Sequence, residues 1–600
     1  KQTSNEANEA TCKNMMDEIT LPSPNPFVPH QFDLRTPRSN TETQDHDHGH
    51  EEEQPQEQKH TTSVAVAGAV DTSNIRTAVA TTVVVVDRPA LRVWFLPDTQ
   101  FHLPHLDVRF ELDTPIFRSS PLHVVLTDVF VRLIRAEINE YAYDADCAAL
   151  HVRVSESEGR LIFSFSGFNH KMSDLAKKVG ERVASLIHDR QYSQENLLNV
   201  LESLRRQYSN QLLDPTDAAR FWRLTVLQTD PIYLFDLDVT KQGVRLLDGK
   251  VTRTTLDKFL SMISEEADLT IHGLVHGNAH AEEAIELVDM FVQYMPVSGS
   301  SSTSHMLKRC SHLRSCKLPS DRSVRLSMPT VNPNERNSAI EIYFQGTGRA
   351  SLFPWFHELS VVRILANLLD EPTFDRLRTK EQLGYTVRCD HRSTCGVVGF
   401  YFSVISASYT TLFIEERCEH FCNCALKYLK EMSTQEYVRR RTGLFHSLSE
   451  PHTDLEESAD EMWSGVVCEC LDGVDKRVAN SVLTVEQEEV IKWWSTHVVA
   501  KSGRKKLVVC VDASNDDGED EKEKDDEEED EGYVEDSSEN SESDDEDEEE
   551  EEEDCLEFPM CGELDVDWWK ASYAVVELEP KDVGSFKATL ELASSEGRFY

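Results

Sequence analysis

Residues 356–374, FHELSVVRILANLLDEPTF, are followed by residues 385–406, YTVRCDHRSTCGVVGFYFSVIS. Apolar residues recur every three to four positions in the first stretch, which predicts an amphipathic helix. The second stretch alternates apolar and polar residues in two runs, which predicts a β-hairpin. A strand over 338–346, SAIEIYFQG, precedes this pair, and a further helix is expected to begin near Thr410. The order of strand, helix, hairpin and helix predicts an α+β unit.

The first half of the chain repeats this order of elements. Its members are a strand in LPHLDVRFELDTP (103–115), a helix at 122–138, a hairpin at 151–168 around Glu158-Gly159, and a helix at 172–188 with Ser173 as its expected N-cap. The pentapeptides EYAYD at 140 and EPTFD at 371 fall at the same point of the two copies. We interpret this as an internal duplication. The predicted fold class is α+β, with two homologous domains that each contain a mainly antiparallel sheet covered by helices.

Low-complexity stretches suggest where these domains begin and end. The segment after residue 38 is polar and charged, the stretch PVSGSSSTSH is typical of a linker, and an acidic run interrupts the apolar strands near the C-terminus. The predicted organisation is a tail of a preceding region at 1–20, a first domain at 21–295 with a disordered insertion at 38–78, a linker at 296–320, and a second domain at 321–600 with an acidic disordered insertion at 515–554.

Length and charge limit the class of protein and of partner. The 600 residues exceed what one core usually holds, so more than one domain is expected. The formal charge is −47, and residues 516–554 contribute 28 Asp and Glu against 2 Lys. This excess of negative charge repels phosphate backbones and anionic lipid. We therefore expect basic peptides as partners, and neither nucleic acid nor a membrane. The longest apolar run, at 77–86, is about half of what a bilayer span needs.

Cysteine usage and the first residue bear on the compartment. Fourteen irregularly spaced cysteines and the lack of any Asn-x-Ser/Thr sequon favour a reducing, cytoplasmic location. Because the chain begins at Lys1 rather than Met, we expect it to be a fragment, with any N-terminal targeting region outside it.

The sequence contains no complete zinc-peptidase motif. Such enzymes need two histidines one helical turn apart with a carboxylate beside them, and neither His-Glu-x-x-His nor His-x-x-Glu-His occurs. The stretch HELSV at His357 lacks the second histidine. His272, His276 and His280 lie across a predicted strand-to-turn junction, where their spacing does not converge on one ion. We expect these histidines to be structural or at the surface.

Two further clusters are also expected to be ordinary. In CEHFCNC, residues 418–424, only Cys418 and Cys422 share a helix face, and a second pair of ligands is missing, so we predict buried thiols. The three histidines between residues 46 and 50 lie in the predicted disordered insertion, where they would form at most a weak adventitious metal site.

Arg378 and Tyr385 differ from these clusters because they flank a helix-to-strand junction. Gly384 supplies the break directly before Tyr385. Two interpretations are open: the guanidinium and the phenol face one cavity, or Arg378 pairs with an acidic neighbour and Tyr385 packs in the sheet. By counting from the pentapeptides, the first copy has Cys147 and Val154 at these positions. Only one copy has the polar pair, as expected for a functional pair rather than one that the fold requires.

The stretch EPTFDRLRTKEQLGYTV, residues 371–387, is similar to the signature in the C-terminal half of the pitrilysin/insulinase family of zinc metallopeptidases. Further similarity, closest to the dibasic-specific branch, is found in GRLIFSFSGFNHKMSDL from Gly159, HGLVHGN from His272 and DVGSFKATLEL from Asp582. The resemblance runs from about residue 20 to the end, apart from the low-complexity insertions.

The resemblance implies a clamshell of two halves, each with two homologous α+β domains, around a chamber for peptides. A His-x-x-Glu-His helix and a distal Glu bind zinc in the N-terminal half, so we expect zinc in the full-length enzyme, none bound by this chain, and no activity of this chain alone. Arg378 would bind a substrate carbonyl. Tyr385 would be the catalytic donor to the oxygen on which negative charge develops. Both groups are expected to face an enclosed peptide track.

The resulting hypothesis is the substrate-binding C-terminal half of a zinc metalloendopeptidase that hydrolyses peptides at basic or dibasic sites. Its expected partners are basic peptide substrates and the N-terminal half of the same enzyme. The alternatives are a non-catalytic family member that binds basic peptides or proteins through its chamber and acidic loop, and an inactive structural subunit of a processing complex.

Overall fold

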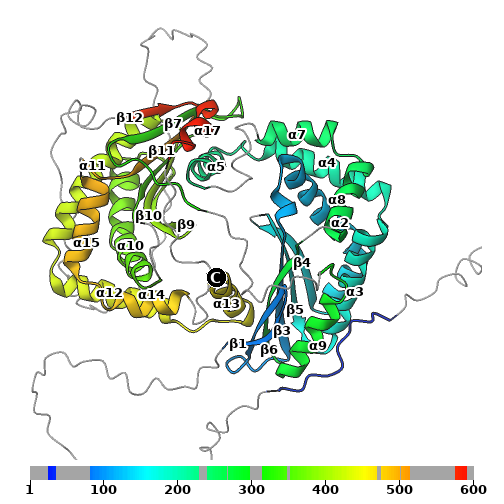
Figure 1. The fold of residues 1–600 in the computed structure, drawn as a ribbon. Helices are drawn as coiled ribbons and strands as arrows, with labels where there is room; N and C mark the ends of the chain where they lie inside the picture. Colours follow the sequence, from blue (N-terminus) through cyan, green and yellow to red (C-terminus); the bar gives the residue numbers. More distant parts are fainter. Residues whose placement is uncertain are drawn as a thin grey trace, which may run out of the picture.

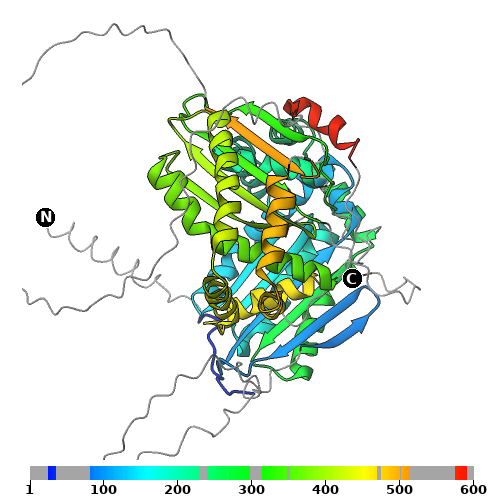
Figure 2. The ribbon, with the colours of Figure 1, turned by 90° about the vertical axis from the view of Figure 1, so that its left-hand side faces the viewer.

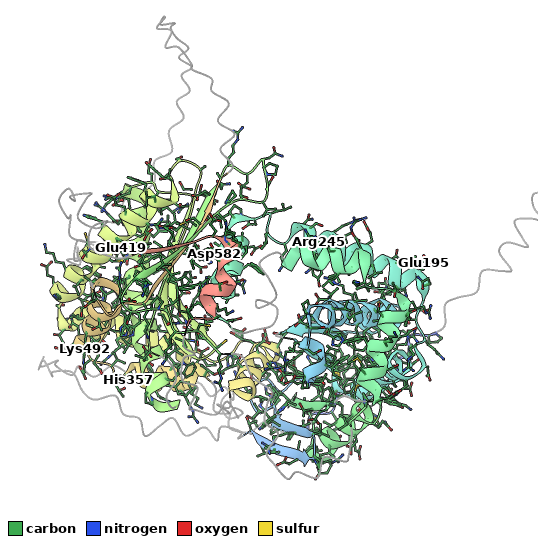
Figure 3. All side chains as sticks on the ribbon, turned by 45° about the horizontal axis from the view of Figure 1, so that its top comes forward. Glu195, Arg245, His357, Glu419, Lys492 and Asp582 are labelled. Atoms are coloured by element: carbon green, nitrogen blue, oxygen red, sulfur yellow. The ribbon has the colours of Figure 1, made fainter. Side chains whose placement is uncertain are left out.

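The computed structural model describes residues 24–35, 82–157, 159–228, 239–265, 268–297, 314–347, 352–468, 474–500, 502–513 and 575–590. In this part the chain forms two halves, each with a six-stranded mixed sheet and a layer of helices (Figure 1). Figure 3 places Glu195 and Arg245 on the first half and His357 and Glu419 on the second. The predicted tail at 1–20 and the predicted insertions at 38–78 and 515–554 lie outside the described residues.

The first half contains the sheet β1-β2-β6-β3-β5-β4. Only the β2/β6 pair is parallel. Its strands are β1 Val83–Arg88, β2 Leu91–Pro97, β3 His105–Asp113, β4 Leu150–Ser157, β5 Arg160–Phe168 and β6 Thr270–Gly277. Its helices are α2 Pro121–Asp146, α3 Met172–Ala184, α4 Gln194–Asn210, α5 Pro215–Leu227, α7 Val239–Gly249, α8 Arg253–Glu265 and α9 Ala281–Val292.

The second half contains the sheet β12-β7-β11-β8-β10-β9. Its strands are β7 Ser323–Pro329, β8 Ser338–Gln345, β9 Thr386–Thr394, β10 Val397–Ser406, β11 Lys506–Asp512 and β12 Val575–Leu578. Its helices are α10 Leu352–Thr373, α11 Thr411–Glu431, α12 Thr434–Ser449, α13 Leu455–Cys468, α14 Val474–Val482, α15 Gln487–Trp494 and α17 Val583–Lys587. Figure 2 views this half from the side of its helices.

The predicted duplication is confirmed by the strand order. The five strands β2-β6-β3-β5-β4 have the same order and directions as β7-β11-β8-β10-β9, including the parallel pairs β2/β6 and β7/β11. In the second sheet β12 adds a further parallel pair with β7. The α+β fold class is therefore confirmed as well. One local prediction is wrong: the chain enters α3 through a 3₁₀ turn over Asn169–Lys171, so Ser173 lies inside the helix and Lys171 is the N-cap residue.

Successive side chains of β8 point to opposite faces of the second sheet, and both faces are buried. Ile340, Ile342 and Phe344 pack against α10 and α11 in one core. Tyr343 points to the opposite face, where it joins a second core with residues of α5. Glu341 is on that same face and is only 3% exposed, so it needs a partner from the element that covers it.

The element that covers this face comes from the first half. Helix α5 packs on β8 and β11, and its Arg223 Nε lies 3.0 Å from a carboxylate oxygen of Glu341. The C-terminal carbonyls of α5, at Thr225 and Gln228, accept hydrogen bonds from Lys587 of α17. A helix that belongs to the first repeat in sequence is therefore part of the second repeat's core.

The exchange is reciprocal, because α13 of the second half packs on β3 and β6 of the first sheet. Trp94, Leu274 and Val466 form a small core between them. His276 Nδ1 lies 2.9 Å from the Leu96 carbonyl, which can only accept, so this nitrogen carries the proton and the Ser458 hydroxyl donates to Nε2 at 3.0 Å.

Helices α5 and α13 occupy the same place in the helix order of the two repeats and lie between the two halves (Figure 1). The exchange therefore holds the halves together through two buried faces.

Candidate functional site

The site begins where α10 loses its α-helical hydrogen bonding. The helix continues as a π-helical turn over Phe374–Lys380, a geometry that is rare and often found at functional sites. Leu377 and Leu383 are fully buried and hold this turn against the core of the second half. The Leu383 N–H also donates to the Leu377 carbonyl at 3.0 Å. The core of the second half thus holds one side of the turn, while the other side of the turn is exposed.

Glu381 ties the turn to α11. Its carboxylate accepts from Arg376 Nε at 2.6 Å and from Arg417 Nε at 2.7 Å. Burial disfavours the charged form, but the hydrogen bonds and charges of Arg417 and Arg376 outweigh burial and hold the pKa of Glu381 below its usual value. The carboxylate is therefore ionised at neutral pH and links Arg376 of the turn to Arg417 of α11.

Gly384 is required by the close approach of two backbone segments. A Cβ atom at this position would lie 1.9 Å from the carbonyl oxygen of Ile405 on β10. Only glycine lets the chain pass at this distance, so Gly384 fixes where Tyr385 leaves the turn and β9 begins.

Arg378 and Tyr385 meet on the exposed side of the turn. Arg378 Nε donates to the backbone carbonyl of Tyr385 at 3.0 Å. Its guanidinium lies 4.6 Å from the ring centre of Phe374 and 5.6 Å from that of Tyr385, within the range of cation–π contacts. The Tyr385 side chain is 86% exposed. The terminal nitrogens of Arg378 and the Tyr385 hydroxyl are thus presented together.

This geometry argues against the second of the two interpretations that the sequence left open, and it does not by itself establish the first. In the part of the chain that the structure describes, Arg378 makes no ion pair with a carboxylate, and Tyr385 does not pack in the sheet. However, the described residues do not enclose the pair, which lines neither of two cavities, one at the ends of β11 and β12 and one between α10, β9 and α12. The enclosed peptide track expected from the sequence is therefore not formed by this part of the chain alone.

The comparison with the first repeat needs a correction. Strands β5 and β10 begin at Arg160 and Val397 and occupy equivalent places in the two sheets, so the position that corresponds to Tyr385 is Ala148 and not Val154. Residues 147–149 alone connect α2 to β4, whereas residues 374–385 connect α10 to β9. Helix α2 has 26 residues, whereas α10 and the π-helical turn that continues it have 22 and 7. The second repeat is therefore longer between the start of its helix and its hairpin, and counting from the pentapeptides misplaces the match.

Sequence reasoning missed three residues of this site. Phe374 stacks on Arg378, and Glu381 pairs with Arg417. The spacing of Phe374 and Arg378, four apart near the end of a predicted helix, was a signal for the stacking. No local signal identifies Arg417, because it lies on a different element.

The other clusters singled out in the sequence have structural contacts. His272 stacks on Trp94, and His280 is the N-cap residue of α9 in a capping box with Glu283. Among the described residues, no group of three or more His, Cys, Asp or Glu side chains is placed to hold a metal ion.

The cysteines of α11 are not alike. Cys418 and Cys422 are buried in the second half's core, and burial raises the pKa of both thiols. Cys424 is disulfide-bonded, so the prediction of buried free thiols holds for the first two only.

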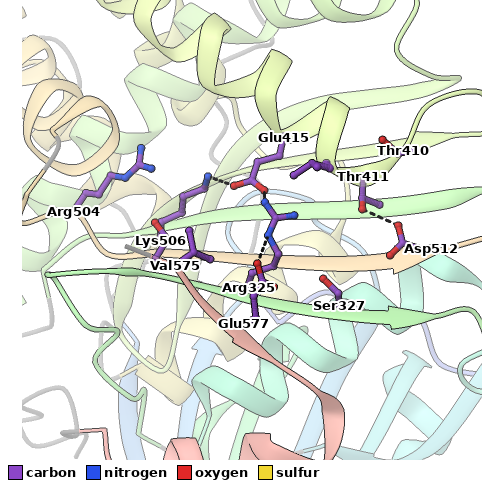
Figure 4. A pocket seen from close by; sticks show the side chains of 12 residues that line it. Arg325, Ser327, Thr410, Thr411, Glu415, Arg504, Lys506, Asp512, Val575 and Glu577 are labelled. Atoms are coloured by element: carbon purple, nitrogen blue, oxygen red, sulfur yellow. Dashed lines mark hydrogen bonds and ion pairs between the residues drawn. The ribbon is translucent and has the colours of Figure 1, made fainter. Parts of the chain in front are cut away.

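One cavity, of about 620 Å³, lies at the ends of β11 and β12 beside the start of α11. Figure 4 shows Arg325 and Lys506 joined through Glu415. Lys506 Nζ also lies 2.5 Å from Glu419, whose pKa is held low by Lys506 and Arg504 despite burial. These charges satisfy one another, so they stabilise the fold and leave no unopposed charge for a ligand.

Comparison with known proteins agrees with the fold. A family model described as the middle or third domain of peptidase M16 matches residues 1–235. A model described as the C-terminal lobe domain 4 of PQQ synthase PqqF-like proteins matches residues 364–463, which include the whole turn.

Relatives are found among nardilysins and insulin-degrading enzymes. The Nardilysin-like protein of Arabidopsis thaliana is 26% identical over 430 residues, which cover 69% of this chain and 38% of that protein. Human nardilysin is 26% identical over 422 residues (69% and 34%), and human insulin-degrading enzyme is 24% identical over 419 residues (70% and 39%).

Solved structures share the fold. The crystal structure of pitrilysin matches with a TM-score of 0.68 at 14% identity and covers 96% of this chain and 49% of pitrilysin. A peptidase M16 inactive domain from Pseudomonas fluorescens matches with a TM-score of 0.52 at 11% identity, covering 72% of this chain and 98% of that one.

The chain belongs to the pitrilysin/insulinase family of peptidases, peptidase M16. Within the family it is nardilysin-like, and it spans between 34% and 38% of the length of the nardilysins just named. No helix in the described ranges is long and apolar enough to cross a bilayer.

Proposed function

We propose that this chain is the substrate-binding C-terminal half of a nardilysin-like zinc metalloendopeptidase that hydrolyses peptides at basic or dibasic sites in the cytoplasm. The observation that carries the proposal is the braced turn that presents Arg378 and Tyr385 together. Similarity to nardilysins supports the proposal. The turn also lies within the stretch that matches the model of the PqqF-like C-terminal lobe domain.

The two side chains have separate roles in this proposal. Arg378 uses Nε to hold the Tyr385 backbone, so its terminal nitrogens are available to donate to a carbonyl of the peptide. The Tyr385 hydroxyl donates to the oxygen that becomes negative during hydrolysis. Removing one such donor typically costs about 2.7 to 4 kcal/mol of transition-state stabilisation, or roughly 10²- to 10³-fold in rate.

The zinc of the family does not fit the residues of this chain. The sequence has no His-x-x-Glu-His motif, and the described side chains with metal-binding atoms form no suitable group. In the proposal, a separate N-terminal half supplies the metal, and this chain supplies peptide binding and the oxyanion donor.

The acidic run at 515–554 has a proposed role in attracting substrate. Its charge raises the local concentration of basic peptides by an attraction that salt screens, with a Debye length of about 8 Å at physiological ionic strength. Deleting 515–554 from the full enzyme should therefore reduce the salt dependence of cleavage next to Arg or Lys. An unchanged salt dependence rules this role out.

A non-catalytic family member that binds basic peptides is the second candidate. It is favoured by the lack of a His-x-x-Glu-His motif in the sequence. Both candidates predict that the chain binds peptides, and only the first predicts that Tyr385 affects hydrolysis.

Reconstitution separates the two candidates. The chain is assayed alone and with the zinc-loaded N-terminal half of a nardilysin, and assembly is measured by analytical ultracentrifugation. We expect no cleavage of a dibasic peptide by the chain alone, cleavage by the assembled pair, and a roughly 10²- to 10³-fold lower rate with Tyr385→Phe. Cleavage by the chain alone contradicts the proposal, as does an assembled pair in which Tyr385→Phe has no effect.

A further inference from the structure

Helix α13 joins the second half to the first sheet, and the face of the sheet that it covers carries two histidines (Figure 1). Every second side chain of β6 points to the same face, so His272 and His276 lie on either side of Leu274. Leu274 packs against Val466 of α13, and His276 contacts Ser458 of the same helix. The contact between the halves therefore contains a group that titrates near neutral pH.

The two hydrogen-bond partners of His276 suit its neutral form. The side chain is 3% exposed, and its Nδ1–H donates to the Leu96 carbonyl at 2.9 Å. Nε2 offers a lone pair, and the Ser458 hydroxyl donates to it at 3.0 Å. A proton on Nε2 would turn this acceptor into a donor, so the hydroxyl would have to rotate away from its present hydrogen bond. The docked helix therefore favours the neutral imidazole.

The carboxylates near His276 are engaged by other groups. Asp107 on β3 is the register partner of His276, and it pairs with Arg109 at 2.7 Å. Asp98, which follows β2, accepts hydrogen bonds from three backbone N–H groups. Asp460 of α13 pairs with Arg109 at 2.5 Å. None of these carboxylates is left to neutralise a charge on the imidazole.

The other acidic side chains of α13 have partners as well. They are Glu456 with Arg153, Glu457 with Thr453, and Glu461 with His452. In the part of the chain that the structure describes, no carboxylate forms an ion pair with His276. A second proton on the imidazole would therefore create a buried charge without a counter-charge in contact, which is costly.

Burial lowers the pKa of the His276 imidazole below its usual value, and it is the largest influence on this group. The Leu96 carbonyl and Asp98 act in the opposite direction, while Arg109 and His452 add to the lowering. An exposed histidine has a pKa of about 6.5, so below that pH the imidazole binds a proton when α13 is undocked and excludes it when α13 is docked. Docking is therefore favoured above this pH and weakened as pH falls.

Asp107 has the opposite effect on docking. Burial raises the pKa of its carboxyl, although Arg109 counteracts this, so the docked state retains a proton on Asp107 more readily than the undocked state does. The usual value is about 3.9, so this effect grows towards lower pH. Asp107 is unchanged in every variant described below, and its contribution cancels when they are compared.

We propose that the contact between α13 and the first sheet is an acid-sensitive joint, in which protonation of His276 displaces Ser458 and undocks α13. The other exchanged helix provides the contrast. Helix α5 contains no histidine, and its Arg223 pairs with Glu341. The contact at α5 should therefore persist while the contact at α13 opens, so that acid loosens the two halves on one side. The inference rests on the fold and does not depend on the proposed peptidase function.

The test is hydrogen exchange of the intact chain at pH 7.5 and pH 5.5, read by mass spectrometry. Labelling times are scaled so that an open amide exchanges equally at the two pH values. One histidine that is excluded from protonation changes an opening equilibrium by up to about tenfold over this range. We expect the opening constant of α13 to rise about threefold to tenfold at pH 5.5 and that of α5 to change little. No rise in α13, or an equal rise in both helices, overturns the inference.

Two histidine variants assign the effect to one residue. His276→Gln keeps a polar side chain but removes the titrating group, so the opening constant of α13 should be the same at both pH values. His446→Gln makes the same change at an exposed position of α12 and should keep the rise seen in the wild type. Both variants retain His272. A rise that persists in His276→Gln, or one that is lost in His446→Gln, contradicts the assignment to His276.

Ser458→Ala separates titration from a simple loss of packing. It removes the hydroxyl and keeps the imidazole, so α13 should be less protected at both pH values and should still open further at pH 5.5. This variant decides the matter if His276→Gln leaves α13 open even at pH 7.5. A rise that is retained in Ser458→Ala supports the joint, and a rise that is lost there overturns it.

Discussion

Replacement of Gly384 by alanine tests the packing that positions Tyr385. The added Cβ would lie 1.9 Å from the Ile405 carbonyl oxygen, whereas ordinary van der Waals contacts begin at 3.4 Å. The turn and β10 must therefore separate by about 1.5 Å. Both partners are backbone, so no side-chain rotation relieves the contact.

The expected cost of Gly384→Ala is about 1 to 3 kcal/mol of stability, as for other overpacked sites. The same displacement moves Tyr385, which is the next residue. A misplacement of about 1 Å costs an active site roughly 100-fold in rate, so binding or turnover that depends on Tyr385 should fall by a comparable factor.

Gly443→Ala is the matched control for this prediction. A Cβ at Gly443 meets nothing within 4 Å, and the residue lies inside α12, where alanine is favoured over glycine by about 1 kcal/mol. Urea unfolding followed by tryptophan fluorescence should show a lower midpoint for Gly384→Ala and an equal or higher midpoint for Gly443→Ala. If both variants unfold at the wild-type midpoint, the close approach at Gly384 does not exist as described.

Three further substitutions test the buried charges. Lys506→Met removes one of the two cations that pair with each of the buried Glu415 and Glu419 and should cost about 3 to 5 kcal/mol, whereas Lys505→Met, at a partly exposed neighbour, should cost much less; similar losses in urea unfolding would contradict the network. Arg109→Met leaves Asp107 buried without a partner and should likewise cost about 3 to 5 kcal/mol, while Asp460→Asn, at a side chain 68% exposed, should cost less than about 1 kcal/mol. Because the pKa of Glu381 is lowered in the fold, its ion pairs stabilise the protein above the usual pKa of about 4.3 and are lost as pH falls through the folded value. Glu381→Gln should therefore be less stable than wild type at pH 7, with a difference that shrinks below about pH 4, and a difference independent of pH would refute the assignment.

The regular elements of this protein were predictable because each carries its own periodic signal. The hairpin at 385–406 and the helix before it were found from alternation and from 3.6-residue spacing. The duplication followed from the order of these elements, and the shared strand order confirmed it.

The exchange of α5 and α13 could not be predicted in the same way. A sequence shows that a helix has an apolar face, but it does not show which sheet that face covers. Arg223 and Glu341 are separated by 118 residues, and only the structure shows that they pair.

The candidate site was predictable in residue identity but not in geometry. The resemblance in sequence pointed to Arg378 and Tyr385. Their orientation depends on the contact of Gly384 with Ile405 and on the link from Glu381 to Arg417, both of which join segments distant in sequence. The count-based match to Val154 failed because the helix and the connection before the hairpin are longer in the second repeat than in the first.

The most direct test of the central claim is the affinity of the intact chain for a fluorescein-labelled dibasic peptide, measured by anisotropy for wild type, Arg378→Met and Arg336→Met. Arg336 is an exposed arginine before β8, outside the turn and both cavities, and serves as the control for loss of positive charge. Hydrogen bonds to a charged group contribute about 1.5 to 3 kcal/mol, so we predict a loss of roughly 10- to 150-fold for Arg378→Met and a much smaller one for Arg336→Met. Equal affinity of wild type and Arg378→Met would contradict the claim that this turn binds the substrate.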